Sequence, residues 1–91
     1  MITAIVFIQA DVAGLSRTAE EIARVGGVSE VYSVTGDLDL VAMVRVRTVD
    51  DIARAVTDGI NTVPGVLSTQ TQIAYRAYSE HDLDAAFSIG D

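Results

Sequence analysis

Two apolar-rich runs meet at a glycine and an aspartate near the middle of the chain, and this break constrains the fold more than any other feature. The first run extends from Val28 to Thr35 and the second from Leu38 to Arg47. Gly36 can take a positive φ without steric cost, and the Asp37 carboxylate can accept hydrogen bonds from nearby backbone N–H groups. Strand-forming residues on both sides of such a break predict a β-hairpin.

The length predicts one domain, residues 1–91, with a small core. A domain of this size buries only about 60–65% of the surface that its unfolded chain exposes. The chain contains no cysteine and one histidine, so we expect neither a disulfide nor a Cys/His metal site to supplement the core. Hydrophobic residues nevertheless make up 49% of the chain. We therefore expect the excess apolar surface to lie in an interface between subunits.

Charge and hydropathy argue against two classes of partner. Six basic residues against 13 acidic residues give a formal net charge of −7, whereas proteins that bind nucleic acid directly are usually basic. No apolar run approaches the roughly 18 residues of a membrane span. The first run, Ile2 to Ala10, also lacks the basic segment that begins a signal peptide. We therefore expect a cytoplasmic protein that binds neither nucleic acid nor membrane.

The segment before the hairpin predicts a strand and then a helix. The run from Ile2 to Ala10 is apolar at both odd and even positions, which is typical of a central strand covered on both faces. Apolar residues then recur at helical spacing, and they are Leu15, Ala19, Ile22 and Ala23. Gly26-Gly27 predicts the left-handed cap that ends this helix.

The segment after the hairpin predicts a helix, a long strand and a short helix. Thr48 is the expected N-cap, with Asp51 at the capping-box position, and Pro64-Gly65 ends the helix. Gly59 on its apolar face costs about 1 kcal/mol of helix propensity, so we expect it to permit a close approach to the sheet. Val66 to Tyr78 alternates as one long strand. The sequence from Ser79 predicts a short C-terminal helix.

The predicted order is therefore βαββαβ with a short C-terminal helix. Two interleaved right-handed β-α-β units give a four-stranded antiparallel sheet with both helices on one face, the ferredoxin-like fold of the α+β class. The strands carry apolar residues on both faces, so the face without helices is also apolar; one face has Ile5, Phe7, Val41 and Met43, and the other has Ala4, Val6, Ala42 and Val44. We expect the face without helices to meet a second copy and to form a dimeric α+β barrel or sandwich.

The hairpin and the last strand resemble a known family. Residues 34–39 read Val-Thr-Gly-Asp-x-Asp, and residues 64–71 read Pro-Gly-Val-x-x-Thr-x-Thr. In this order they resemble the amino-acid-sensing domain, or RAM domain, of the Lrp/AsnC transcriptional regulators, and the resemblance extends from about Ile2 to Tyr78. Full-length members carry an N-terminal helix-turn-helix. This sequence begins at the first strand and is similar to the stand-alone members without that DNA-reading half.

The resemblance implies an assembly and a ligand. In this family, dimers form through their sheets and assemble into rings of four or five dimers, so the implied state is an octamer or decamer. A free amino acid binds between neighbouring dimers against the Gly-Asp loop. On this chain, Asp37 would bind the ligand's ammonium, and Asp39 would either assist or only hold the turn. Backbone N–H groups from Gly36 to Leu38 would bind the ligand's carboxylate.

The complete implied ligand site comprises Thr35, Gly36, Asp37, Leu38, Asp39, Thr69 and Thr71. Thr69 and Thr71 would add hydroxyl contacts from the last strand. Threonine is common in strands, however, so an ordinary strand role for both residues stays open.

Two classes of function remain open. The resemblance implies a non-catalytic amino-acid sensor that acts with a full-length Lrp/AsnC regulator or through another protein. The alternative is a small dimeric enzyme of the same topology, similar to the cofactor-free monooxygenases, which needs a pocket containing His, Trp or Asn. The chain has no Trp, and His81 lies outside the predicted sheet. We predict no catalytic residue, cofactor or metal site, and we expect the acids around His81 to be a solvated helix start.

Overall fold

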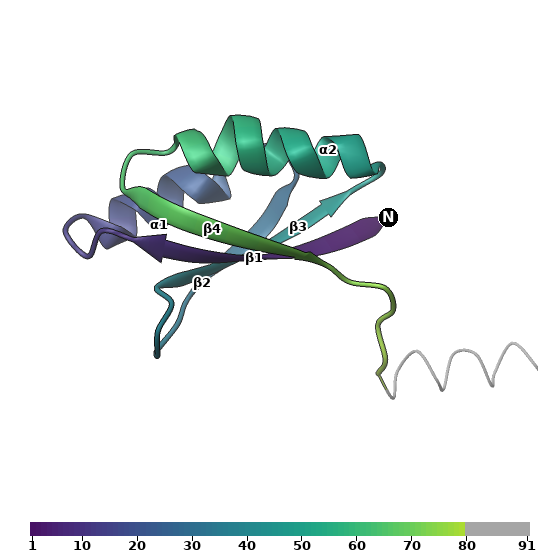
Figure 1. Ribbon diagram of the computed structural model, residues 1–91, viewed down its shortest axis with the longest axis horizontal. Coiled ribbons are helices and arrows are strands. Elements are labelled where there is room, and N and C mark those ends of the chain that lie inside the picture. The colour runs from purple at the N-terminus through teal and green to yellow at the C-terminus, as the bar shows by residue number, and fades with distance from the viewer. Residues whose placement is uncertain (80–91) are drawn as a thin grey trace, which may run out of the picture.

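The computed structural model shows an antiparallel sheet with its helices on one face (Figure 1). The structure describes residues 1–79, and the predicted C-terminal helix lies outside them. The sheet has the strand order β2-β3-β1-β4. Its strands are β1 (Ile2–Ala10), β2 (Val28–Ser33), β3 (Leu40–Val46) and β4 (Val66–Ile73).

The helical layer consists of α1 and a second, composite helix. The elements are α1 (Leu15–Ala23), α2 (Val49–Ala53), the π-helical turn η1 (Arg54–Gly59) and the 3₁₀ turn η2 (Ile60–Thr62). Element order and topology confirm the predicted ferredoxin-like α+β fold. Within the part of the chain that the structure describes, no helix is long and apolar enough to cross a membrane.

The core lies between the sheet and the helices. β1 pairs with β3 in a register that places Ile8 opposite Leu40. The fully buried side chains that these strands contribute are Ala4, Val6, Ile8, Leu40, Ala42 and Val44. Ile22 from α1 and Ile60 from η2 are also fully buried and complete this core. The alternation of strand side chains therefore gives one closed face, as the sequence predicts.

The opposite face of the sheet, which we call the open face, has no helix of residues 1–79 over it (Figure 1). Residues at the odd positions of β1 and β3 point toward it. Ile5, Phe7, Val41 and Met43 lie there and are half-buried. The central strands thus carry apolar residues on both faces, which confirms the pattern expected from the sequence.

α1 is fixed to the turn before β4 by a buried threonine. The Thr18 hydroxyl donates to the Pro64 carbonyl at 3.2 Å and to the Gly14 carbonyl at 3.3 Å. Gly65 has a φ of +99° and faces Thr18 so closely that a Cβ there would collide with Oγ1. The expected apolar stripe of α1 is therefore wrong at one position, because Thr18 is buried while Ala23 is exposed.

The second helix begins at the predicted N-cap, but Gly59 in its interior has a different neighbour from the one predicted. The Thr48 hydroxyl caps it by accepting from the Asp51 N–H at 3.1 Å. The Asp51 carboxylate lies near Arg54, with Oδ1 and Nη1 3.4 Å apart. The prediction that Gly59 permits a close approach to the sheet is wrong. A Cβ at Gly59 would instead collide with Val25, which follows α1, so the close approach is to the loop after that helix.

β4 is shorter than the strand predicted to reach Tyr78. It pairs only with β1, and its last contact is the bond from the Ala74 N–H to the Thr3 carbonyl at 2.9 Å. Since β1 begins at Ile2, the chain beyond Ala74 has no neighbouring strand to pair with. A strand ends where its partner ends, because its N–H and C=O groups then turn to other partners.

The hairpin is also shorter than predicted. β2 ends at Ser33 and β3 begins at Leu40, so residues 34–39 form a loop rather than a tight two-residue turn. Gly36 in this loop has a φ of +106°, which confirms the left-handed glycine expected at the break.

Candidate ligand site

The loop of residues 34–39 carries most of the predicted ligand site. It projects from the sheet on the side away from the helices (Figure 1). Thr35, Gly36 and Asp37 are exposed, whereas Leu38 and Asp39 are half-buried. The tip of the loop is thus open to solvent, and its base is part of the folded domain.

Asp39 fixes the base of the loop to the end of β1. Its Oδ2 accepts from the Ala10 N–H at 2.8 Å, and its own N–H donates to the Ile8 carbonyl at 3.0 Å. Its carbonyl accepts from the Val34 N–H at 3.1 Å and closes the loop. Hydrogen bonds between a carboxylate and backbone N–H groups are charge-assisted. Asp39 therefore holds the loop in place, which is one of the two roles that the sequence left open.

Asp37 is in the opposite situation. Its exposed carboxylate makes no hydrogen bond or ion pair with another residue in the range 1–79. The backbone N–H groups of Gly36, Asp37 and Leu38 likewise donate to no residue in that range. The loop, whose base is fixed, therefore has one carboxylate and three consecutive N–H donors that can bind a ligand. This arrangement can bind a positive and a negative group of one small molecule.

The two threonines lie elsewhere on the chain. Thr69 and Thr71 pair in register with Ile8 and Val6, so they point to the helix side of β4. Both are half-buried, and the Thr69 hydroxyl donates to the Asn61 Oδ1 at 2.7 Å. β1 lies between β4 and the base of the loop, and the loop projects on the side of the sheet away from the helices. A single chain therefore does not bring these threonines to the loop.

The contact between Asn61 and Thr69 was not foreseen from the sequence, which marks Asn61 only as the end of a helix. The two residues are eight positions apart and flank the Pro64-Gly65 turn. A turn that reverses the chain places such residues side by side, so this spacing is a usable signal.

Other chemistry has little support in the described range. Among residues 1–79, no group of three or more His, Cys, Asp or Glu side chains is placed to hold a metal ion. The acids around His81 lie outside that range. Tyr32, Tyr75 and Tyr78 are exposed, and none of the three is part of the core.

Comparison with known proteins identifies the family. The model of the Lrp/AsnC ligand-binding domain matches residues 3–84. The HTH-type transcriptional regulator YugG of Bacillus subtilis is 36% identical over 78 residues, which cover 86% of this chain and 46% of YugG. The chain thus spans about half the length of the curated relatives that it matches.

Solved structures show the same architecture. TTHA0845 from Thermus thermophilus is 45% identical, with a TM-score of 0.82 over 88% of this chain and 100% of that chain. A transcriptional regulator from Neisseria meningitidis, solved as an L-Met complex, has a TM-score of 0.76 over 87% of this chain and 53% of its own. Its identity is 15%, so that likeness concerns the fold. The family model covers nearly the whole sequence, and the chain therefore belongs to the family of Lrp/AsnC ligand-binding domains.

Proposed function

We propose that this chain is an oligomeric, amino-acid-binding regulatory domain that responds to a free amino acid at the loop of residues 34–39. The observation that carries the proposal is the Asp37 carboxylate and the three N–H groups of residues 36–38, none of which has a partner among residues 1–79. An α-amino acid presents an ammonium and a carboxylate on one carbon, and these two groups match that pair of features.

The hydrogen bonds at the base of the loop support this assignment. Asp39 holds the base of the loop by hydrogen bonds to Ala10 and Ile8, so the N–H groups at the tip need little reordering when a ligand binds. Ordering a mobile loop on binding costs affinity, and a loop fixed in advance avoids that cost. Asp39 thus acts as a positioning residue and Asp37 as the direct contact.

The site is incomplete in one chain, because the loop tip is exposed and the threonines point to the helix side of β4, whereas the loop projects on the opposite side. A neighbouring copy would cover the tip, exclude water and strengthen the charged contacts. The half-buried apolar residues of the open face give each copy a surface for a face-to-face dimer. Dimers would then assemble further, as an octamer or decamer, and place Thr69 or Thr71 of one copy near the loop of another.

The domain's own charge makes direct contact with DNA unfavourable, because a net charge of −7 repels phosphate. The relatives are HTH-type transcriptional regulators, and regulators and ligand-binding domains of this kind are not enzymes. We therefore infer a sensor without catalytic activity that passes its signal to a DNA-binding regulator.

Titration calorimetry on the protein, with the free L-amino acids tried one at a time and L-methionine first, tests the ligand. For the best ligand, Asp37→Ala removes one charge-assisted contact of about 1.5–3 kcal/mol, so affinity should fall roughly ten- to a hundredfold. The melting temperature without ligand should stay near the wild-type value, since Asp37 has no partner to lose.

Two further variants make the test specific. Asp50→Ala removes an equally exposed carboxylate from the start of α2 and should leave affinity unchanged. Asp39→Ala should lower the melting temperature, with weaker binding following from the disturbed loop. Wild-type affinity in Asp37→Ala, or no response to any amino acid, would show that the loop is only a turn.

A further inference from the structure

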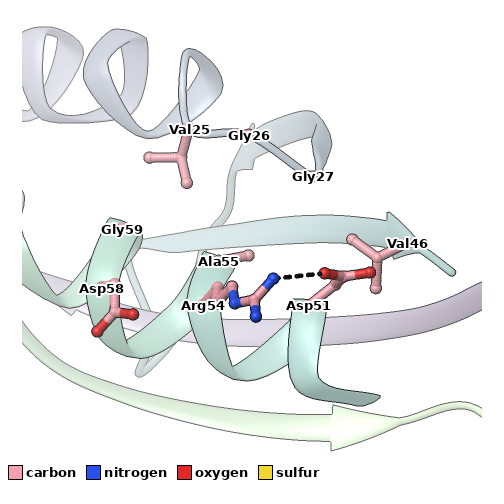
Figure 2. Close-up of a pocket in the computed structure, with 9 residues that line it drawn as sticks. All are labelled: Val25, Gly26, Gly27, Val46, Asp51, Arg54, Ala55, Asp58 and Gly59. Atoms are coloured by element: carbon pink, nitrogen blue, oxygen red, sulfur yellow. Dashed lines mark hydrogen bonds and ion pairs between the residues drawn. The ribbon is translucent and has the colours of Figure 1, made fainter. Parts of the chain in front are cut away.

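A cleft of about 440 Å³ lies between the loop after α1 and the composite second helix (Figure 2). Its apolar lining comes from Val25, Val46 and Ala55, and its charged lining from Asp51, Arg54 and Asp58. Gly26, Gly27 and Gly59 contribute backbone. No residue of the 34–39 loop lines it, so the cleft is separate from the candidate ligand site.

Two glycines let the walls of the cleft pack closely against neighbouring side chains. Gly27 has a φ of +94°, and a Cβ there would lie 2.8 Å from the Val46 Cγ1. Gly59 meets Val25 so closely that it also has no room for a Cβ. Both positions therefore require glycine on steric grounds, because the Val46 and Val25 side chains occupy the space that a Cβ would take.

Two of the three charged residues of the cleft come from one wide turn of helix, and the third, Asp51, lies in α2. Arg54 and Asp58, together with Ala55 and Gly59, belong to the π-helical turn η1. Such turns are rare and are found frequently at functional sites. Figure 2 shows the Arg54 guanidinium directed toward Asp51 across the surface of this helix.

The polar groups of the cleft are only weakly engaged. Arg54 Nη1 and Asp51 Oδ1 are 3.4 Å apart, and the Arg54 side chain is 73% exposed, so this ion pair is easily exchanged for a ligand. The exposed Asp58 carboxylate has no partner within the described range. The N–H groups of Gly26 and Gly27 donate to no residue in that range either.

We propose that this cleft is a second binding site and that it takes a basic amino acid, a molecule with one carboxylate and two cationic nitrogens. Arg54 and the Gly26 and Gly27 N–H groups would bind the ligand's carboxylate. Asp51 and Asp58 would each bind one cationic nitrogen. The aliphatic stem would lie along the apolar lining given above.

Charge complementarity selects this ligand class. Two carboxylates and one guanidinium give the cleft a formal charge of −1, and a basic amino acid carries +1. A neutral amino acid would leave one carboxylate unpaired, and a diamine would leave the guanidinium and the two N–H donors without an anion. Both would lose charge-assisted contacts that the basic amino acid makes.

Titration calorimetry in an Asp37→Ala background tests the site, because that variant disables the loop and separates the two sites. L-lysine should bind saturably. L-norleucine lacks the side-chain ammonium and cadaverine lacks the carboxylate, and each should bind at least about tenfold more weakly. Absence of saturable L-lysine binding, or equal binding of L-norleucine, would overturn the proposal and leave the function of the loop untouched.

Substitutions in the cleft test whether L-lysine binds there. Asp58→Asn and Arg54→Gln should each weaken L-lysine binding by at least about tenfold, with melting curves showing that both proteins remain folded. Asp50→Asn is the matched control, because Asp50 is an exposed acid on the same helix that does not line the cleft, and its affinity should equal that of the background protein. Unchanged affinity in Asp58→Asn would place the ligand elsewhere.

Discussion

The two faces of the sheet are built from the same strands but are closed in different ways. On the helix side, Val6 and Ile8 of β1 are fully buried by the chain's own helices. Their neighbours Ile5 and Phe7 point to the open face and are only half-buried. The chain thus completes one hydrophobic face by itself, and the other is the face through which we propose that it associates.

The composition of the open face supports the proposed interface. Apolar residues of β1 and β3 occupy its centre, and polar pairs lie toward both edges of the sheet. Arg45 and Glu30 form an ion pair at 2.8 Å on one side, and the Ser68 hydroxyl donates to the Gln9 Oε1 at 3.0 Å on the other. An apolar centre with a polar rim is the usual anatomy of a subunit interface.

The largest expected loss of stability comes from a substitution on the helix side of the sheet. Ile8→Ala removes a fully buried side chain from the middle of the core and leaves a cavity. The free energy of unfolding should fall by about 2–5 kcal/mol. Urea denaturation followed by circular dichroism measures this loss, which should be nearly independent of protein concentration if the helix side is closed within each chain. A loss below about 1 kcal/mol would mean that the core repacks around residue 8.

The next effect sharpens the comparison, because it applies the same kind of truncation to the adjacent residue on the other face. Phe7→Ala should weaken self-association by no more than about 1.5–3 kcal/mol per subunit, the value for fully burying such a side chain, because Phe7 is already half-buried in the single chain. Stability of the separated chains should change much less. Analytical ultracentrifugation over a dilution series measures the association. Unchanged association would show that the open face is not the interface.

Much of the fold was predictable because it depends on short-range patterns. The double-sided apolar pattern of β1, the positive φ of Gly36 and the Thr48 cap all follow from residues a few positions apart, and the structure contains each of them. The left-handed helix cap expected at Gly26-Gly27 is wrong, because α1 already ends at Ala23 with Arg24 as a right-handed C-cap. The burial of Thr18 was not predictable in the same way. Its partner Pro64 is 46 residues away, and only the folded arrangement brings the two together.

The same distinction between local patterns and contacts of distant segments applies to the two candidate sites. The Gly-Asp loop is visible in the sequence, but the role of Asp39 depends on the Ala10 N–H, 29 residues earlier. The cleft at the second helix was not foreseen at all. It exists because the loop after α1 passes over a π-helical turn, and helical periodicity predicts neither the π turn nor the neighbouring loop. Contacts between distant segments therefore decide what a local motif does.

The smallest effect concerns the rim of the open face. Arg45 donates to the Ser29 hydroxyl and to the Glu30 carboxylate, and the Arg45 and Glu30 side chains are 42% and 39% exposed in a single chain. An exposed pair of this kind contributes about 0.2–1 kcal/mol. In the Phe7→Ala background at concentrations where the chains are separate, Glu30→Gln should therefore lower stability by no more than that amount, and added salt should reduce the difference.

In the assembled wild type the same substitution should cost more, because water is partly excluded and the guanidinium loses its compensating charge. Urea denaturation of both backgrounds at low and high salt measures the two values. Equal costs would mean that association leaves the ion pair in water, and the interface would then be confined to the apolar centre of the sheet.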